Sequence, residues 1–235
     1  MDIPLMISKF LQTFFFLLSI LPLHAEQTIE KFLLITGSSR SGTTYTAKVL
    51  TLAGLEIGHE HLKADGCSSW LMNVKTNHAP YGYIRTDLVH YQHIFHQVRD
   101  PLKTISSISS TEKEKAFIFF REYIPEIDRE KDSRLVQSAK YWYYWNLKAE
   151  AQAEWRYKIE ELDDVWDEMN ERLGLSLSKI PLKTTRKTIN HRPLPLQKIT
   201  WADLKRELSP DLFLAIQEMS MRYGYPINDE EYEHF

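Results

Sequence analysis

The chain has 235 residues, of which 43% are hydrophobic and 12% aromatic, and its formal net charge at pH 7 is −3. This length can bury the core of one domain, and the slightly acidic balance gives no support to binding of nucleic acid or of an anionic membrane surface. Any anionic ligand must therefore be held by a few local donors. The single cysteine, Cys67, excludes an internal disulfide.

The N-terminus carries a largely apolar segment at residues 10–23, preceded by Lys9 and followed by Ala25. This pattern resembles the hydrophobic region of a signal peptide, with Ala25 at the cleavage position. The segment is shorter than the roughly 20 residues that a membrane-spanning helix needs. Extending it back to Ile3 reaches that length but places Lys9 inside the span.

Three interpretations of this segment stay open: a cleaved signal, a short signal-anchor, or an amphiphilic extension of a cytosolic protein. We therefore divide the chain into an N-terminal extension at 1–28 and a domain at 29–235. Residues 5–23 are expected to associate with a membrane or to direct the chain to the secretory pathway, which means the Golgi lumen in a eukaryote. A cytoplasmic location is the alternative.

The domain is expected to open with a strand, a loop and a helix. Residues 32–36 are an apolar run that ends at Gly37, as in a buried strand. Residues 43–54 begin with threonines, carry apolar residues along a helical segment and end at Gly54. A strand, a glycine-bracketed loop and a helix in this order are typical of the start of a phosphate-binding α/β domain.

The remainder of the domain alternates between strands and helices. Residues 55–74 contain Gly58 and Gly66 and are expected to be irregular and to line a cleft. Pro101 suits the first turn of a helix. Further strands are expected at 93–98 and 155–159, and helices at 113–123, 133–154, 163–173, 200–208 and 210–223. This order predicts a single α/β domain with a P-loop-type parallel β-sheet flanked by α-helices on both faces.

The loop at residues 37–44 has the sequence GSSRSGTT. Its two glycines allow backbone N–H groups to turn inward toward an anion, and the following helix adds its positive N-terminal end. In the nucleoside-triphosphate version of this loop, a lysine follows the second glycine. Here Thr43 takes that position and the cation is Arg40, and we find no convincing apolar strand that ends in a Walker-B aspartate. A small-molecule kinase of the P-loop class is therefore disfavoured and stays as an alternative.

The segment from Arg40 to Thr44, RSGTT after a strand, resembles the 5′-phosphosulfate loop of sulfotransferases that use 3′-phosphoadenosine-5′-phosphosulfate (PAPS). The family's second motif is an arginine at the end of a later strand with a serine eight residues on, and together they grip the donor's 3′-phosphate. Arg99 and Ser107 have this spacing. Residues 159–162 and 199–204 also resemble segments of the family, but the match is weaker. The donor-binding residues that this resemblance implies are Gly37, Ser38, Ser39, Arg40, Ser41, Gly42, Thr43, Thr44, Tyr45, Arg99 and Ser107.

The resemblance implies transfer of a sulfuryl group from PAPS to a hydroxyl or amine acceptor, with the bisphosphate PAP as product and no metal. Arg40 would neutralise the leaving 5′-phosphate. Some family branches, including tyrosylprotein sulfotransferase-like members, place a catalytic glutamate after a glycine at about the distance of Glu60. His59 and His61 stay open as the base, because the pKa of histidine is ordinarily nearer neutral.

Other roles are predicted with alternatives. Tyr45 stacks on adenine or belongs to the core, and Lys75 stabilises the transferring group. The acceptor is a small molecule, a carbohydrate or a peptide, and residues 59–78 and 141–145 are expected to shape its cleft, the latter mostly as core. A metal at His59 and His61, or at the histidines of 90–96, is disfavoured because neither set has a complete ligand pattern. A non-catalytic nucleotide-binding module is the remaining functional alternative. The basic residues expected to close over the 3′-phosphate are Lys183, Arg186, Lys187 and Arg192.

Overall fold

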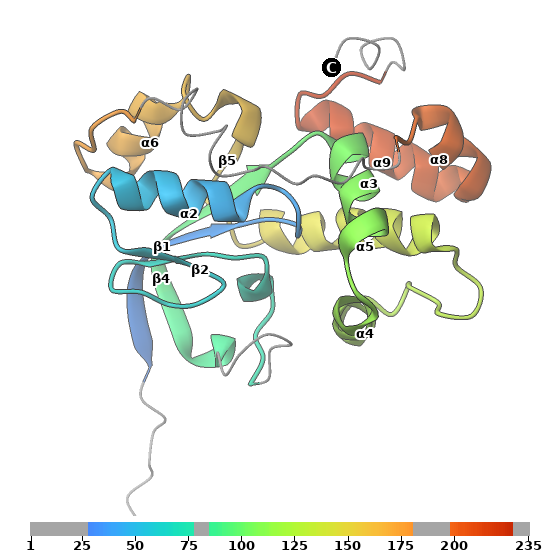
Figure 1. Cartoon of the computed structure of the whole chain (residues 1–235), viewed down its shortest axis with the longest axis horizontal. Helices are drawn as coiled ribbons and strands as arrows, with labels where there is room; N and C mark the ends of the chain where they lie inside the picture. Colours follow the sequence, from blue (N-terminus) through green and yellow to red (C-terminus); the bar gives the residue numbers. More distant parts are fainter. Residues whose placement is uncertain (1–27, 78–84, 181–197, 228–235) are drawn as a thin grey trace, which may run out of the picture.

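The computed structural model describes residues 28–77, 85–180 and 198–227 (Figure 1). In these ranges five strands form one sheet in the order β2-β3-β1-β4-β5, and all the neighbouring strands are parallel. The parallel sheet expected from the sequence is thus confirmed. The strands are β1 (Ile29–Thr36), β2 (Ile57–His59), β3 (Gly66–Ser68), β4 (Val89–Val98) and β5 (Trp155–Lys158).

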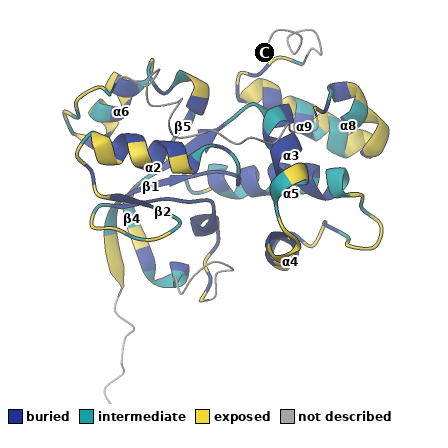
Figure 2. Ribbon diagram, viewed as in Figure 1, coloured by how far each residue is buried: buried dark blue, intermediate teal, exposed yellow. Residues whose placement is uncertain are grey.

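Helices cover both faces of this sheet, as predicted. Successive residues of a strand point to opposite faces. Accordingly Leu33, Ile35 and Phe95 pack in one hydrophobic cluster with α2 and α6, whereas His96 contacts Asn146 of α5 on the other face. The helices are α2 (Thr43–Leu52), α3 (Pro101–Thr111), α4 (Glu114–Tyr123), α5 (Arg134–Glu150), α6 (Trp166–Leu173), α8 (Trp201–Glu207) and α9 (Pro210–Arg222), with short 3-10 turns η1 (Leu71–Asn73), η2 (Thr86–Leu88) and η3 (Ile159–Glu161). Figure 2 shows the buried residues on the central strands and on the inner side of α5.

The expectation that residues 55–74 are irregular is wrong in part, because β2 and β3 lie there. Both strands have three residues, and each contains a glycine that indicates a loop in the sequence. Gly66 is required by close packing: a Cβ would lie 1.9 Å from the Leu33 carbonyl oxygen of the neighbouring strand, and its φ is +143°. A Cβ on Gly58 would lie 1.9 Å from the His61 carbonyl oxygen. These glycines permit close backbone contacts at the sheet.

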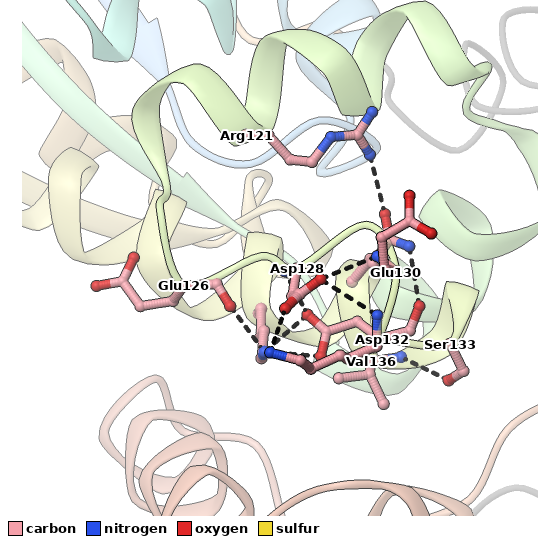
Figure 3. Close-up of polar contacts among 10 residues, drawn as sticks. Arg121, Glu126, Asp128, Glu130, Asp132, Ser133 and Val136 are labelled. Carbon is pink, nitrogen blue, oxygen red and sulfur yellow. Dashed lines mark hydrogen bonds and ion pairs between the residues drawn. The ribbon is translucent and has the colours of Figure 1, made fainter.

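The loop between α4 and α5 is closed by its own carboxylates (Figure 3). Asp132 accepts a hydrogen bond from the backbone N–H of Asp128 at 2.8 Å and pairs with Lys140 Nζ at 2.7 Å. Asp128 in turn accepts from the N–H of Glu130 at 2.9 Å. Ser133 then caps α5 by accepting from the N–H of Val136. These bonds fix where α5 begins, and α5 carries Tyr141, whose hydroxyl accepts from the N–H of Ser39 in the loop after β1.

The described helices include none that is both long and apolar enough to cross a membrane. The apolar segment at residues 5–23 lies outside the described ranges, and so do the basic residues expected at 183–192.

Candidate functional site

The loop and Arg99 are neighbours at one edge of the sheet. In a parallel sheet all carboxyl ends of the strands share an edge, and ligands bind where the connections diverge. From β1 the chain leads through α2 to β2 on one side, and from β4 it leads through α3 and later helices to β5 on the other. The pairing of Thr36 with His96 sets the loop that begins at Gly37 beside Gln97 and Arg99.

The first residue of the loop is Gly37, and the neighbouring strand β4 leaves no space for a side chain at this position. A Cβ there would lie 2.2 Å from the carbonyl oxygen of Gln97. The Gln97 side chain is fully buried, and its Nε2 donates to the carbonyl of Ser41 at 2.9 Å. Its Oε1 accepts from the hydroxyl groups of Thr46 and Tyr157. Gln97 therefore ties the loop to α2 and to β5, a role that sequence analysis missed.

Arg40 connects the two motifs that the sequence placed far apart. Its Nε donates to Ser107 Oγ at 3.1 Å, and its carbonyl accepts from Arg99 Nη1 at 3.0 Å. The backbone of Arg40 is left-handed, with φ of 66°, a conformation that costs a non-glycine residue about 1 kcal/mol or more. Contacts at both ends of the residue hold it there. The loop and the residue that directly follows β4 thus place two guanidinium groups at the same edge of the sheet.

The loop retains donors that an anion needs. Gly42, with φ of 102°, caps α2 without a side-chain bond, and the first turn of α2 has no acidic residue. The positive end of the helix therefore faces the loop without a side-chain counter-charge from its first turn. The buried hydroxyl of Ser41 has no hydrogen-bond partner in the described part of the chain. In contrast, the N–H of Ser39 donates to the hydroxyl of Tyr141 at 2.9 Å, so α5 occupies one of the loop's backbone donors.

Glu60 follows β2 at the same edge of the sheet. Its Oε1 accepts from Trp70 Nε1 at 2.8 Å and lies 3.6 Å from His59 Nε2. Burial raises the pKa of Glu60, and the Trp70 bond opposes this by favouring the carboxylate. Glu60 has a φ of 56°, so a second non-glycine residue at this edge adopts the left-handed conformation. A partly exposed carboxyl group with a raised pKa suits a general base for a substrate hydroxyl.

His59 contacts the loop directly. Its Nε2 lies 3.0 Å from Thr44 Oγ1 and 3.3 Å from Thr43 Oγ1. Burial, followed by the charges of His61 and Lys48, lowers the pKa of His59 to about 4, so the ring is neutral at pH 7. His61 bonds instead to the carbonyl of His59 through Nδ1 and is exposed. The structure therefore associates His59 and Glu60 with the loop more closely than His61.

Two predicted roles do not fit the structure. Tyr45 is 3% exposed and belongs to the hydrophobic cluster under α2, so its ring does not present a face for adenine. Lys75 Nζ donates to the carbonyl of Val89 at 2.6 Å. Val89 begins β4, whereas the loop lies where β4 ends, so Lys75 is at the opposite edge from any transferring group.

The aromatic run at residues 141–145 is mainly core, as expected. Tyr141, Trp142 and Trp145 are at most 1% exposed. The histidines of β4 do not form a cluster: His93 pairs with Glu154 and His96 with Asn146. Among the described residues, no three histidine, cysteine or acidic side chains gather as metal ligands.

Sequence reasoning also missed Glu112 and Asn73. Glu112 Oε1 lies 3.9 Å from Arg40 Nε. Asn73 accepts from Thr36 Oγ1 at 2.8 Å and donates to the carbonyl of Gly37 at 3.3 Å, which fixes the junction of β1 with the loop. Asn73 is a polar residue between apolar ones and Glu112 lies in a run of polar residues, and neither pattern identifies a partner.

Comparison of the chain with profiles of known protein families, with curated proteins and with solved structures found no match.

Proposed function

We propose that this chain is a sulfotransferase that uses PAPS as donor and a hydroxyl or amine compound as acceptor. The observation that carries the proposal is the convergence on Arg40: Ser107 binds its side chain and Arg99 binds its carbonyl. A loop of this shape alone supports only anion binding. An arginine within the loop, and a second arginine beside it, suit a donor that carries phosphate at two ends.

The residues present fit such a donor. The N-terminal end of α2 and the Arg40 guanidinium would hold the 5′-phosphate end, and the orphan hydroxyl of Ser41 would gain a partner there. Arg99 and Ser107 would hold the 3′-phosphate. Tyr45 is not included, because it is buried in the core.

The donor supplies a sulfuryl group, whose bond to the bridging phosphate oxygen breaks as the acceptor oxygen or nitrogen bonds to sulfur. In this scheme the Glu60 carboxylate takes the proton that the acceptor loses. Arg40 stabilises the negative charge that develops on the leaving oxygen. The neutral ring of His59 fixes Thr43 and Thr44 at the start of α2.

The first test is donor binding. PAP should raise the melting temperature of the wild-type protein, and Arg40→Ala or Arg99→Ala should remove this shift. Lys103→Ala is a matched control. Lys103 is a cation in the first turn of α3, the helix that carries Ser107, and the proposal gives it no role in donor binding. Stabilisation by ATP with magnesium and none by PAP would instead support the P-loop kinase alternative.

The second test is turnover. Transfer of radiolabelled sulfate from PAPS to a panel of phenols, carbohydrates and tyrosine peptides should be detectable with the wild-type protein. PAP binding without transfer to any member of the panel, and without PAPS hydrolysis, would favour a non-catalytic nucleotide-binding module.

A further inference from the structure

Glu112 presents a carboxylate to Arg40, the cation of the loop. Glu112 follows α3 directly, so the same helix that carries Ser107 also presents Glu112. Ser107 Oγ lies 3.1 Å and Glu112 Oε1 lies 3.9 Å from Arg40 Nε. The carboxylate side chain is 13% exposed and the guanidinium 20%, so solvent screens this pair less than it screens a surface pair.

The position of Glu112 is fixed by backbone contacts that do not involve the loop. Its N–H donates to the carbonyl of Ile108 at 3.1 Å, which closes the end of α3. Its carbonyl accepts from Arg134 Nη2 of α5. The backbone of Glu112 is therefore fixed by α3 and α5, and from this position its side chain reaches Arg40.

Charged and titratable groups face Glu112 from each surrounding element. Burial raises the pKa of Glu112, and the Glu60 charge adds to this. The Arg134 guanidinium opposes it by favouring the carboxylate. Tyr141, which holds the N–H of Ser39, also lies within electrostatic reach of Glu112. The carboxyl group is thus near a loop donor, an arginine and a second acid.

We propose that Glu112 is an internal counter-ion of Arg40 that competes with any anion entering the loop. An incoming phosphate and the Glu112 carboxylate need the same guanidinium, and two anions cannot both be neutralised by it. Entry of the anion is then coupled to loss of the Glu112 contact or to protonation of its carboxyl group. The identification of the anion as the phosphosulfate end of PAPS rests on the proposed function, whereas the competition itself does not.

The test measures dissociation constants of PAP and of inorganic pyrophosphate by calorimetry for the wild type, Glu112→Gln and Glu168→Gln. Glu168 is a matched control, because its carboxylate pairs with Arg172 within α6 and has no contact with the loop in the described structure. At pH 8 the Glu112→Gln protein should bind both probes roughly fivefold more tightly or better, in the range of ordinary coupling between sites. The control should match the wild type.

The pH dependence separates competition from a structural role. Wild-type affinity should move toward that of Glu112→Gln as the pH is lowered from 8, because burial raises the pKa of Glu112 and protonation removes the competing charge. Taking the ratio of the two proteins at each pH cancels the titration of the probe itself. Melting curves verify folding, and Glu112→Ala provides a second neutral variant.

Equal or weaker binding by both neutral variants, or a ratio that does not change with pH, would overturn the counter-ion role and leave the proposed function standing. Tighter pyrophosphate binding by Glu112→Gln in a protein that does not bind PAP would support the counter-ion and overturn the donor assignment. A wild type that binds neither probe would contradict both.

Discussion

The guanidinium of Arg40 lies 3.1 Å from the hydroxyl of Ser107, although 67 positions separate the two residues in the chain. This contact joins the loop after β1 to the helix after β4. Because the carbonyl of Arg40 also accepts from Arg99, one residue links the loop to both Arg99 and Ser107.

Two substitutions of Arg40, whose backbone is left-handed, test donor binding and stability separately. Arg40→Gly and Arg40→Ala both remove the guanidinium, so both should abolish stabilisation by PAP. The glycine variant should nevertheless be more stable than the alanine variant by up to about 1 kcal/mol, because only alanine has a Cβ that conflicts with a φ of 66°. Urea denaturation of the two proteins measures the difference. A more stable alanine variant would show that this conformation is not strained.

Gly37 tests the close approach between the loop and β4. Gly37→Ala should lower the free energy of unfolding by about 3 kcal/mol, because its Cβ would overlap the backbone oxygen of Gln97. Gly174→Ala is the matched control: its φ is +65°, but nothing lies within 4 Å of the added carbon, so we expect a loss of about 1 kcal/mol. Equal losses in urea denaturation would contradict the packing argument.

Substitution of Glu60 tests its proposed role as the general base. Glu60→Gln should reduce kcat by about 10² to 10⁴-fold and leave the dissociation constant of PAP nearly unchanged. The glutamine retains an oxygen that can accept from Trp70 Nε1, so folding should be preserved. In the wild type, activity should rise with pH through the raised pKa of Glu60, since only the carboxylate accepts a proton. Single-turnover kinetics measure both effects, and retention of full activity by the variant would exclude Glu60 as the base.

His96 tests a pH effect on stability. Burial lowers the pKa of His96 from 6.5 to about 4, so the ring is neutral in the fold and protonated in the unfolded chain between those values. Unfolding then takes up a proton, and stability should fall as the pH decreases from 6.5 toward 4. This pKa shift corresponds to a loss of roughly 3 kcal/mol in the free energy of unfolding once His96 is fully protonated in the unfolded chain.

The measurement compares urea denaturation at pH 7 and pH 4.5 for the wild type, His96→Gln and His90→Gln. Glutamine keeps a donor toward Asn146 but does not titrate in this range. The His96→Gln protein should therefore lose less stability between pH 7 and pH 4.5 than the wild type. His90 is exposed, and its replacement should leave the pH dependence unchanged. An identical pH dependence in the His96 variant would contradict the assignment.

The sequence could predict the elements whose signals are local. The strand, the loop at 37–44 and α2 follow from an apolar run, two glycines and a helical pattern. The spacing of Arg99 and Ser107 was likewise visible, because both lie on one strand-to-helix segment. Short strands were not, since β2 and β3 have three residues each and contain the glycines that usually mark loops.

Only the tertiary structure decided which residues meet at the loop. Tyr141, Gln97 and Glu112 contact the loop, although each is 56 to 102 positions away from its loop partner in the chain. No local sequence pattern encodes such pairs. The same holds for Tyr45, whose helix face was predictable but whose burial depends on how α2 packs on the sheet. Sequence alone indicated an anion-binding loop with Arg40 as its cation. The fold showed that Ser107 and Glu112 lie beside that cation and that Arg99 bonds to the Arg40 carbonyl, because long-range strand order brings the carboxyl ends of β1 and β4 together.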